Sequence, residues 1–435
     1  DTPTVTPTAT PTSVPGELPR PVAINPESPQ WARFQAHTAY DTVHQRFLVV
    51  WHDKRNDPGR EWALGYGLDN NGDIYGRLVQ PDGTAVGSAD IAISTAAQDA
   101  QWPFVVFNPQ MQEYLVAWQE VDPLATRVNW NQFTYCYNIR AQRIDADGEL
   151  RGEPILVSGA IDCQWVPIIS YDSATNQYLI IWHDHRYRQG MTPPRVPETA
   201  KEIFGQWLSY NGQTLELSGD NFVVTTSTAL PHGPAPRYQQ YATIVYHAGQ
   251  HDLFWSDDRA GSGVDEAFDI YQQRLTGGQT AAAGNTLTYG ATGTQEKPRA
   301  AFNTANNQVW VVWQDYLNPP PAPDPGATDI RLRRLDANGA AMGNAQLVAS
   351  NVGRWPVPDI ACRAGGVCDI LWSGSGGAAG IWLARYSADG SAQGVPRRLA
   401  PGPTNDPRVV AVDGDQLWAV FAGAGHVWVT LLPGE

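Results

Sequence analysis

One short apolar run that ends in an aromatic residue recurs seven times along this chain, and it constrains the fold more than any other feature. The runs are FLVVW (47–51), YLVAW (114–118), YLIIW (178–182), DLFW (252–255), VWVVW (309–313), CDILW (368–372) and LWAVF (417–421). Their ends lie 49 to 73 residues apart, near or above the length of a four-stranded propeller blade. Solid apolar runs rich in Val and Ile are typical of strands that are buried on both faces.

Each run lies within a larger unit of four predicted strands. An apolar segment that closes on an aromatic residue and Asn precedes it, as in PFVVFN (103–108) and PRAAFN (298–303). A third strand such as DIYGRL (73–78) follows a variable loop, and a tight turn then leads to a fourth strand such as PILVS (154–158). We therefore predict an all-β fold, a seven-bladed β-propeller of four-stranded antiparallel blades.

The seventh unit is one strand short. It contains PRVVAV (407–412), LWAVF (417–421) and VWVTLL (427–432), with no fourth strand after them, whereas PVAIN (21–25) precedes the first unit without a unit of its own. A closed ring needs its last blade to meet its first, and unpaired strand edges are a liability. We predict that residues 21–25 complete the seventh blade and close the ring. The alternative, an open array of seven hairpin pairs, leaves this strand unexplained.

Residues 1–19 form a predicted tail that differs in kind from the propeller domain at 20–435. Thr occupies alternate positions of this tail, namely Thr2, Thr4, Thr6, Thr8, Thr10 and Thr12. Thr/Pro tracts are typical of extended stalks with O-linked glycans, so these threonines are candidate O-glycosylation sites. Because Pro3, Pro7 and Pro11 all fall on one edge of an extended segment, the other edge keeps its N–H donors and could add to a neighbouring sheet. We expect self-association through residues 1–15.

Charge and cysteine content limit the possible partners and compartments. The net charge is −15, and we find no basic patch or stripe, which argues against a nucleic-acid partner. No stretch approaches the ~20 apolar residues of a membrane-spanning helix. We expect two disulfides, Cys136–Cys163 and Cys362–Cys368, whose spacings match no zinc pattern. Disulfides favour an exported protein, and a chain that begins at Asp1 without a signal peptide is expected to be a mature form, extracellular or at the cell surface.

An acidic residue follows the second strand of most units, two positions after the aromatic residue. The aspartates at this position are Asp53, Asp184, Asp257 and Asp315, and the second unit has Glu120 there. One interpretation is a ring of carboxylates around a central channel that binds a ligand or cation or transfers protons. The alternative, which we favour, is that each Asp caps its loop and pairs with a nearby Arg or with backbone N–H groups.

Aromatic residues precede several of the first strands. They are Trp102, Trp165, Tyr238 and Trp355. We expect them to rim the mouth of the channel, where flat rings beside polar groups could stack on sugars. The alternative is packing between adjacent blades. Together with the four aspartates, these aromatic residues form the candidate ligand-binding set.

The order W-x-D, then D-I-Y, then an aliphatic residue four positions before Gly resembles propeller repeats that are common in exported bacterial proteins. This pattern covers nearly all of residues 20–435 and differs from WD40 and kelch repeats. The resemblance implies location and shape, and it carries over no catalytic residues. The chain also lacks a Walker loop, a dinucleotide fingerprint and an H-E-x-x-H motif, so we expect no metal site and no cofactor.

Two functions from different classes fit these patterns. The one we favour is an extracellular structural or adhesive protein, such as a fibre or surface-layer subunit that assembles through its Thr/Pro-rich tail. The alternative is a carbohydrate-binding or glycoside-cleaving propeller that uses the aromatic and carboxylate-lined channel mouth, with glycans as partners. Fold alone does not decide between them.

Overall fold

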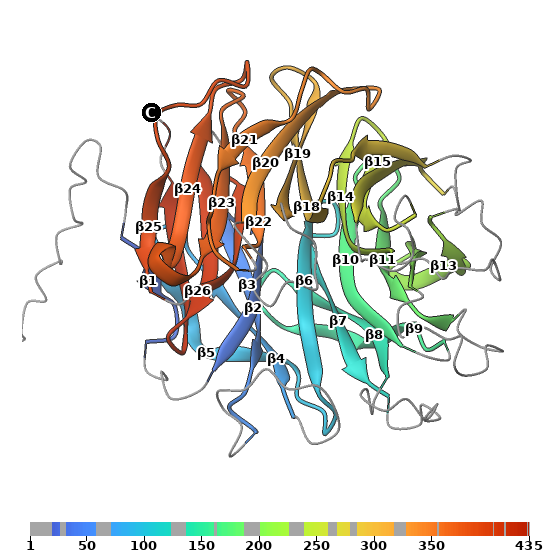
Figure 1. Ribbon diagram of the computed structural model, residues 1–435. Helices are drawn as coiled ribbons and strands as arrows, with labels where there is room; N and C mark the ends of the chain where they lie inside the picture. Colours follow the sequence, from blue (N-terminus) through green and yellow to red (C-terminus); the bar gives the residue numbers. More distant parts are fainter. Residues whose placement is uncertain are drawn as a thin grey trace, which may run out of the picture.

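Seven four-stranded antiparallel sheets build the protein in a computed structural model (Figure 1). The structure describes residues 20–26, 32–57, 71–122, 136–160, 163–186, 201–225, 239–259, 268–278, 285–316, 328–354, 356–402, 404–412, 415–432 and 434. The threonine tail and residues 1–15 lie outside this part of the chain. Along the described segments, no helix has the length and apolar character needed to cross a membrane.

The first four sheets follow the chain in order, each built from four consecutive strands. The first blade contains β2 (Arg33–Asp41), β3 (Arg46–Asp53), β4 (Asp73–Val79) and β5 (Ala85–Ser94). The second contains β6 (Ala100–Asn108), β7 (Glu113–Val121), β8 (Tyr137–Asp145) and β9 (Leu150–Ser158). The third contains β10 (Gln164–Asp172), β11 (Gln177–Asp184), β12 (Glu202–Asn211) and β13 (Thr214–Val223). The fourth contains β14 (Gln239–His247), β15 (Gln250–Asp257), β16 (Asp269–Thr276) and β17 (Thr286–Tyr289).

The fifth and sixth sheets continue the same order. The fifth blade contains β18 (Thr294–Asn303), β19 (Gln308–Tyr316), β20 (Thr328–Asp336) and β21 (Gln346–Ala349). The sixth contains β22 (Pro358–Cys362), β23 (Cys368–Gly374), β24 (Gly380–Tyr386) and β25 (Arg397–Pro401), with a short 3-10 helix at Gly376–Ala378. The predicted seven-bladed all-β propeller is therefore confirmed.

The seventh sheet takes strands from both ends of the chain. Three of its strands are consecutive, β26 (Thr404–Ala411), β27 (Leu417–Gly423) and β28 (His426–Leu432). The fourth is β1 (Val22–Ala23), which pairs antiparallel with β28 and lies in dark blue beside the red strands in Figure 1. This strand is shorter than the predicted 21–25, although the backbone N–H of Ile24 still donates to the carbonyl of Val427 (3.0 Å).

The hydrophobic core lies between neighbouring blades. The recurrent aromatic residue of the second strand is fully buried in five blades, at Trp51, Trp118, Trp182, Trp255 and Trp313. Between the first and seventh blades, the rings of Phe47 and Trp418 stack with centroids 3.8 Å apart. Because second strands pack against a blade on each side, both of their faces are apolar, which explains the unbroken runs in the sequence.

Both predicted disulfides form. Cys136 and Cys163 join the approach to β8 in the second blade to the approach to β10 in the third blade. Cys362 and Cys368 pair directly across the hairpin between β22 and β23. The first disulfide therefore links two blades, whereas the second closes a turn within one blade.

Candidate functional site: the central channel

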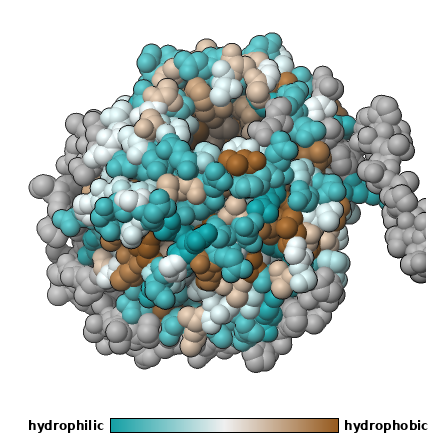
Figure 2. Space-filling view, turned by 180° about the vertical axis from the view of Figure 1, so that it is seen from behind, coloured by the Kyte–Doolittle hydropathy of each residue, from teal (hydrophilic) through white to brown (hydrophobic). Residues whose placement is uncertain are grey.

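A cavity of about 360 Å³ lies on the axis of the ring. All seven innermost strands contribute to its wall, namely β2, β6, β10, β14, β18, β22 and β26. The space-filling view shows one face of the molecule hollowed (Figure 2). A volume in the range of about 300–1,000 Å³ is typical of small-molecule sites in proteins.

Aromatic side chains line the end of this cavity that faces the hairpins between first and second strands. They occupy equivalent positions, one residue before the hairpin, and they are Tyr40, Phe107, Tyr171 and Tyr246. Each is partly exposed and packs its ring against an aromatic residue of the second strand, as Tyr171 does on Tyr178 (centroids 5.3 Å apart). We call this set the aromatic end of the cavity.

Charged side chains line the cavity on the three remaining first strands, at a level three residues before the aromatic one. Arg299 on β18, Asp359 on β22 and Arg408 on β26 come from three consecutive blades. Asp359 accepts a hydrogen bond from the backbone N–H of Val409 (2.8 Å). At the same level of the other blades lie His37, Phe104, Ile168 and Thr243. The level is therefore charged on one side of the axis and mainly apolar on the other.

Burial governs the electrostatics of this charged level. Desolvation, reinforced by the neighbouring Arg408, lowers the pKa of Arg299 to about 10. The pKa of His37 falls well below its usual value through burial and the cations Arg408 and Arg299, so His37 is neutral at physiological pH. Burial raises the pKa of Asp359. The carboxylates of Asp359 and Asp406 act on Arg299 in the opposite direction, so two acids lie near the two arginines.

A β-bulge at the start of most first strands sets the register of these residues. The first residue of the bulge has positive φ in six blades, at Gln35, Trp102, Val166, Tyr241, Lys297 and Asp406. Pro or Ala follows each of them, and proline suits a bulge because it has no N–H to pair with the ladder. Positive φ is uncommon for residues other than glycine. A hydrogen bond from the neighbouring blade stabilises this backbone conformation. The backbone N–H of Val166 donates to Gln119 Oε1 of the preceding blade (2.9 Å).

The aspartates predicted after the second strands are engaged within their own blades. Asp184 accepts a hydrogen bond from the indole N–H of Trp182 (2.8 Å) and forms an ion pair with Arg186 (2.7 Å). The same arrangement holds for Asp53 with Trp51 and Arg55 and for Asp257 with Trp255 and Arg259. Asp315 instead pairs with Arg331 and accepts a hydrogen bond from Gln295 (3.1 Å). These buried carboxylates therefore make the contacts that the favoured alternative expects, and a ligand-binding role for them stays a prediction.

Two of the four predicted rim aromatics lie in the described residues. Trp102 is the positive-φ residue of its bulge, is partly exposed, and donates its backbone N–H to Gln35 Oε1 of the first blade (2.8 Å). Trp165 packs on His185 (centroids 5.0 Å apart) and under the Lys201 ammonium (5.3 Å). Tyr238 and Trp355 lie outside the described residues, and the ligand-binding role of all four stays a prediction.

The charged cavity residues were not predicted, although the sequence contains a signal for them. PRAAFN (298–303) and PRVVAV (407–412) each place an arginine inside a first strand that is otherwise apolar. The aromatic end was visible as well, because the aromatic residue before the hairpin marks the repeat. Among the described residues, no three His, Cys, Asp or Glu side chains are grouped so that they could hold a metal ion.

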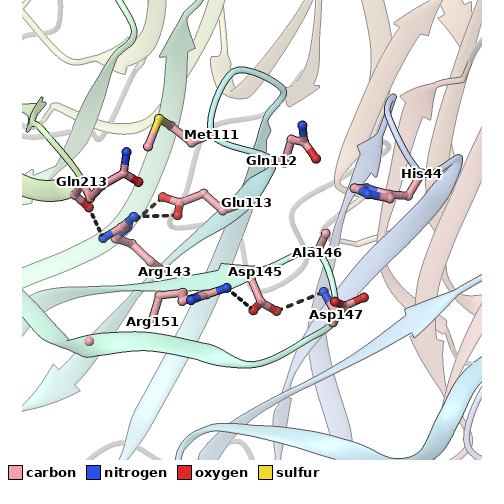
Figure 3. Close-up of a pocket in the computed structure, with 11 residues that line it drawn as sticks. His44, Met111, Gln112, Glu113, Arg143, Asp145, Ala146, Asp147, Arg151 and Gln213 are labelled. Carbon is pink, nitrogen blue, oxygen red and sulfur yellow. Dashed lines mark hydrogen bonds and ion pairs between the residues drawn. The ribbon is translucent and has the colours of Figure 1, made fainter.

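A second cavity, of about 510 Å³, lies among the hairpins of the first three blades (Figure 3). Its charged side chains already bind one another: Glu113 pairs with Arg143 (2.8 Å) and Asp145 with Arg151 (2.8 Å). Arg143 also donates to the carbonyl of Gln213 in the next blade (2.9 Å). Because these partners satisfy each other, this cavity offers a ligand fewer unused donors than the channel does.

Comparison with known proteins agrees with the fold and adds no family. No family model matches the chain, and no curated protein matches it. A solved structure of a protein of unknown function from Dyadobacter fermentans covers 97% of this chain and 100% of its own, with 10% identity and a TM-score of 0.55. The BP39L lectin from Burkholderia pseudomallei covers 92% of this chain and 98% of its own (11% identity, TM-score 0.48). An α-L-arabinanase from Penicillium chrysogenum covers 77% and 93% (12% identity, TM-score 0.46).

At these identities the similarity shows the fold alone. The class of protein is thus a seven-bladed β-propeller with a cavity on its axis. The resemblance to exported bacterial repeat proteins stays a prediction, since no family model supports that repeat type.

Proposed function

We propose that this protein is an extracellular carbohydrate-binding propeller that takes a saccharide into its central channel. The observation that carries the proposal is the aromatic end of the cavity, where Tyr40, Phe107, Tyr171 and Tyr246 lie around one opening. Flat aromatic rings offer apolar area to the C–H faces of a sugar. The Tyr171 hydroxyl already donates to Asn176 Oδ1 (3.0 Å), so the proposal rests on the rings.

The polar groups of the wall are few and placed at defined levels. His37, neutral because of burial, lies at the level of Arg299 and Asp359. Ser170 lies between the aromatic end and this level, where its hydroxyl also contacts the Nδ1 atom of His251 (3.0 Å). Apolar rings combined with a few convergent polar groups are typical of a site for a small polar ligand.

The two disulfides support an extracellular location, because such bonds persist in oxidising compartments. The structural or adhesive role that we favoured from the sequence depends on residues 1–15, which lie outside the described residues. It stays a prediction.

A glycan array with the purified protein tests the proposal, followed by calorimetric titration of the best ligand. We expect Phe107→Ala and Tyr246→Ala each to weaken binding by about 1–3 kcal/mol through loss of a stacking platform. Tyr289→Ala, on the outer strand of the fourth blade and away from the cavity, is the matched control. Unchanged affinity in both cavity variants would exclude the channel as the site.

A further inference from the structure

We propose that Arg299 and Arg408 form a binding site for an oxyanion, so that the saccharide taken into the channel carries a carboxylate or a sulfate group. The inference rests on the proposed function for the rest of the ligand. The anion site itself rests on the geometry of the two arginines, which lie on blades five and seven with Asp359 of blade six between them.

Both guanidinium groups keep most of their hydrogen-bonding capacity. A guanidinium has five N–H donors. Within the described part of the chain, Arg299 donates to the carbonyl of Pro298 (2.9 Å) and Arg408 to the carbonyl of Pro407 (3.1 Å). Both side chains line the cavity, so their remaining donors are accessible to a molecule inside it. The planar fork of arginine matches the geometry of carboxylate and sulfate oxygens.

Repulsion between the two arginines favours an anion beside them. Burial and the charge of Arg408 both lower the pKa of Arg299, whereas the carboxylates of Asp359 and Asp406 oppose this effect. The Asp359 carboxylate also accepts the Val409 N–H. An added oxyanion would contact two partly buried cations, and such an interaction is stronger there than in bulk water.

Other charged groups lie nearer the end of the channel where the first strands begin. Lys297 and Asp406 occupy equivalent bulge positions two residues before the arginines. Glu296 precedes Lys297, and its carboxylate accepts hydrogen bonds from Gln240 (3.2 Å) and Gln314 (3.1 Å). Lys297, Asp406 and Glu296 therefore lie between the arginines and the start of the first strands. Together they add one positive and two negative groups.

The spacing of the two cavity levels fits a short saccharide. Arg299 and Arg408 lie three residues from the aromatic level on their strands, a rise of about 10 Å. That is roughly the length of two sugar rings. A ligand could therefore stack on Tyr171 or Tyr246 and place an acidic substituent between the arginines.

Calorimetric titration with a matched set of probes tests the inference: methyl glucoside, glucuronic acid and glucose 6-sulfate, together with oligomers of the best binder. We expect the acidic probes to bind at least about tenfold more tightly than the neutral one, with binding weakened by salt. Arg299→Gln and Arg408→Gln should each remove this preference, so that the acidic and neutral probes bind the variants with similar affinity. Arg397→Gln, an exposed arginine on β25, is the matched control.

A second measurement separates failure of this inference from failure of the proposed function. Inorganic sulfate alone should raise the thermal midpoint of the wild-type protein, and this rise should shrink in both variants. If no sugar binds but the sulfate effect is present and lost in the variants, the anion site holds and the carbohydrate function fails. Equal affinity for acidic and neutral sugars, or an undiminished sulfate effect in both variants, would overturn the anion site. Circular dichroism establishes that the variants are folded.

Discussion

The Nε2 atom of His183 on β11 accepts a hydrogen bond of 2.6 Å from the backbone N–H of Tyr241 on β14, the innermost strand of the next blade. His183 is the middle residue of a Trp-x-Asp motif, and Tyr241 is the positive-φ residue of a bulge. The same relationship joins Gln119 to Val166 and Ser256 to Lys297. The variable position of the motif thus holds the channel wall of the neighbouring blade in place.

Removing this acceptor should destabilise the junction between the third and fourth blades. We expect His183→Ala to lower the free energy of unfolding by about 1–3 kcal/mol, because a partly buried N–H loses its partner. His183→Gln should restore part of the loss, since its amide oxygen can accept the same bond. Denaturant unfolding of the three proteins measures the effect. Equal stability of all three would show that the Tyr241 N–H does not depend on this bond.

Loss of a motif carboxylate should cost more than loss of an exposed one. We expect Asp184→Ala to reduce the free energy of unfolding by about 3 kcal/mol, because it leaves the Trp182 indole N–H and the Arg186 guanidinium without their buried acceptor. Asp220→Ala on the exposed edge of β13 is the control and should change stability by less than about 0.5 kcal/mol. Similar losses in the two variants would contradict a blade-stabilising role for Asp184.

The N-terminal strand should matter to stability while the segment before it should not. Asn25 is fully buried, its side-chain oxygen accepts the N–H of Val427 (3.1 Å), and the carbonyl of Ile24 accepts Arg77 (2.8 Å). We expect deletion of residues 1–25 to lower the thermal midpoint and to promote association through the exposed edge of β28. Deletion of residues 1–19 is the control and should leave the midpoint unchanged. Identical behaviour of the two truncations would argue against ring closure by β1.

The stability of the protein should fall as pH rises through the window set by Glu202. Burial, with repulsion from Asp184 and Asp257, raises the pKa of Glu202 to about 7 from an ordinary value of 4.5. Between these two values the folded state binds more protons than the unfolded state, so the contribution of this group is present at low pH and is lost as pH rises.

Thermal unfolding from pH 4 to 8 measures this contribution. We expect Glu202→Gln, which cannot ionise, to flatten the decline relative to the wild type. The control is Glu216→Gln, at an exposed position on β13. A variant curve parallel to the wild-type curve throughout this range would show that Glu202 does not titrate as proposed.

Much of the fold was predictable because each blade repeats the same local pattern. The buried run around Trp182 and the turn after β12 each indicate a strand or hairpin without knowledge of the rest of the chain. Cys362 and Cys368 could be paired because they flank one hairpin. The pair Cys136–Cys163 was also expected, but at one end of a single blade, whereas it links successive blades. The acidic position after the second strand repeats as well, and the contacts of Asp184 to Trp182 and Arg186 are those that the favoured loop-capping interpretation expects.

The candidate site was less predictable because it departs from the repeat. Arg299, Asp359 and Arg408 are separated by about 50 to 60 residues in sequence, and no local pattern joins them. Their strands are otherwise typical first strands. Which side chains lie beside the charged residue of each strand is known only when the blades are placed around an axis. The bulge before Arg299 makes its position harder to predict, because it shifts the register between β18 and β19.

The sequence by itself determined the number of blades, the order of consecutive strands within them and the disulfide pairs, because these depend on segments that are close along the chain. The pairing of β1 with β28 is the exception, since it joins the two ends of the chain. Only the tertiary structure decided what the centre of the ring contains. Closing seven sheets around one axis brings equivalent positions of all the first strands to the same level. That superposition places Tyr171 and Tyr246 at one level and Arg299 and Arg408 at another, which gives the channel its aromatic and cationic levels.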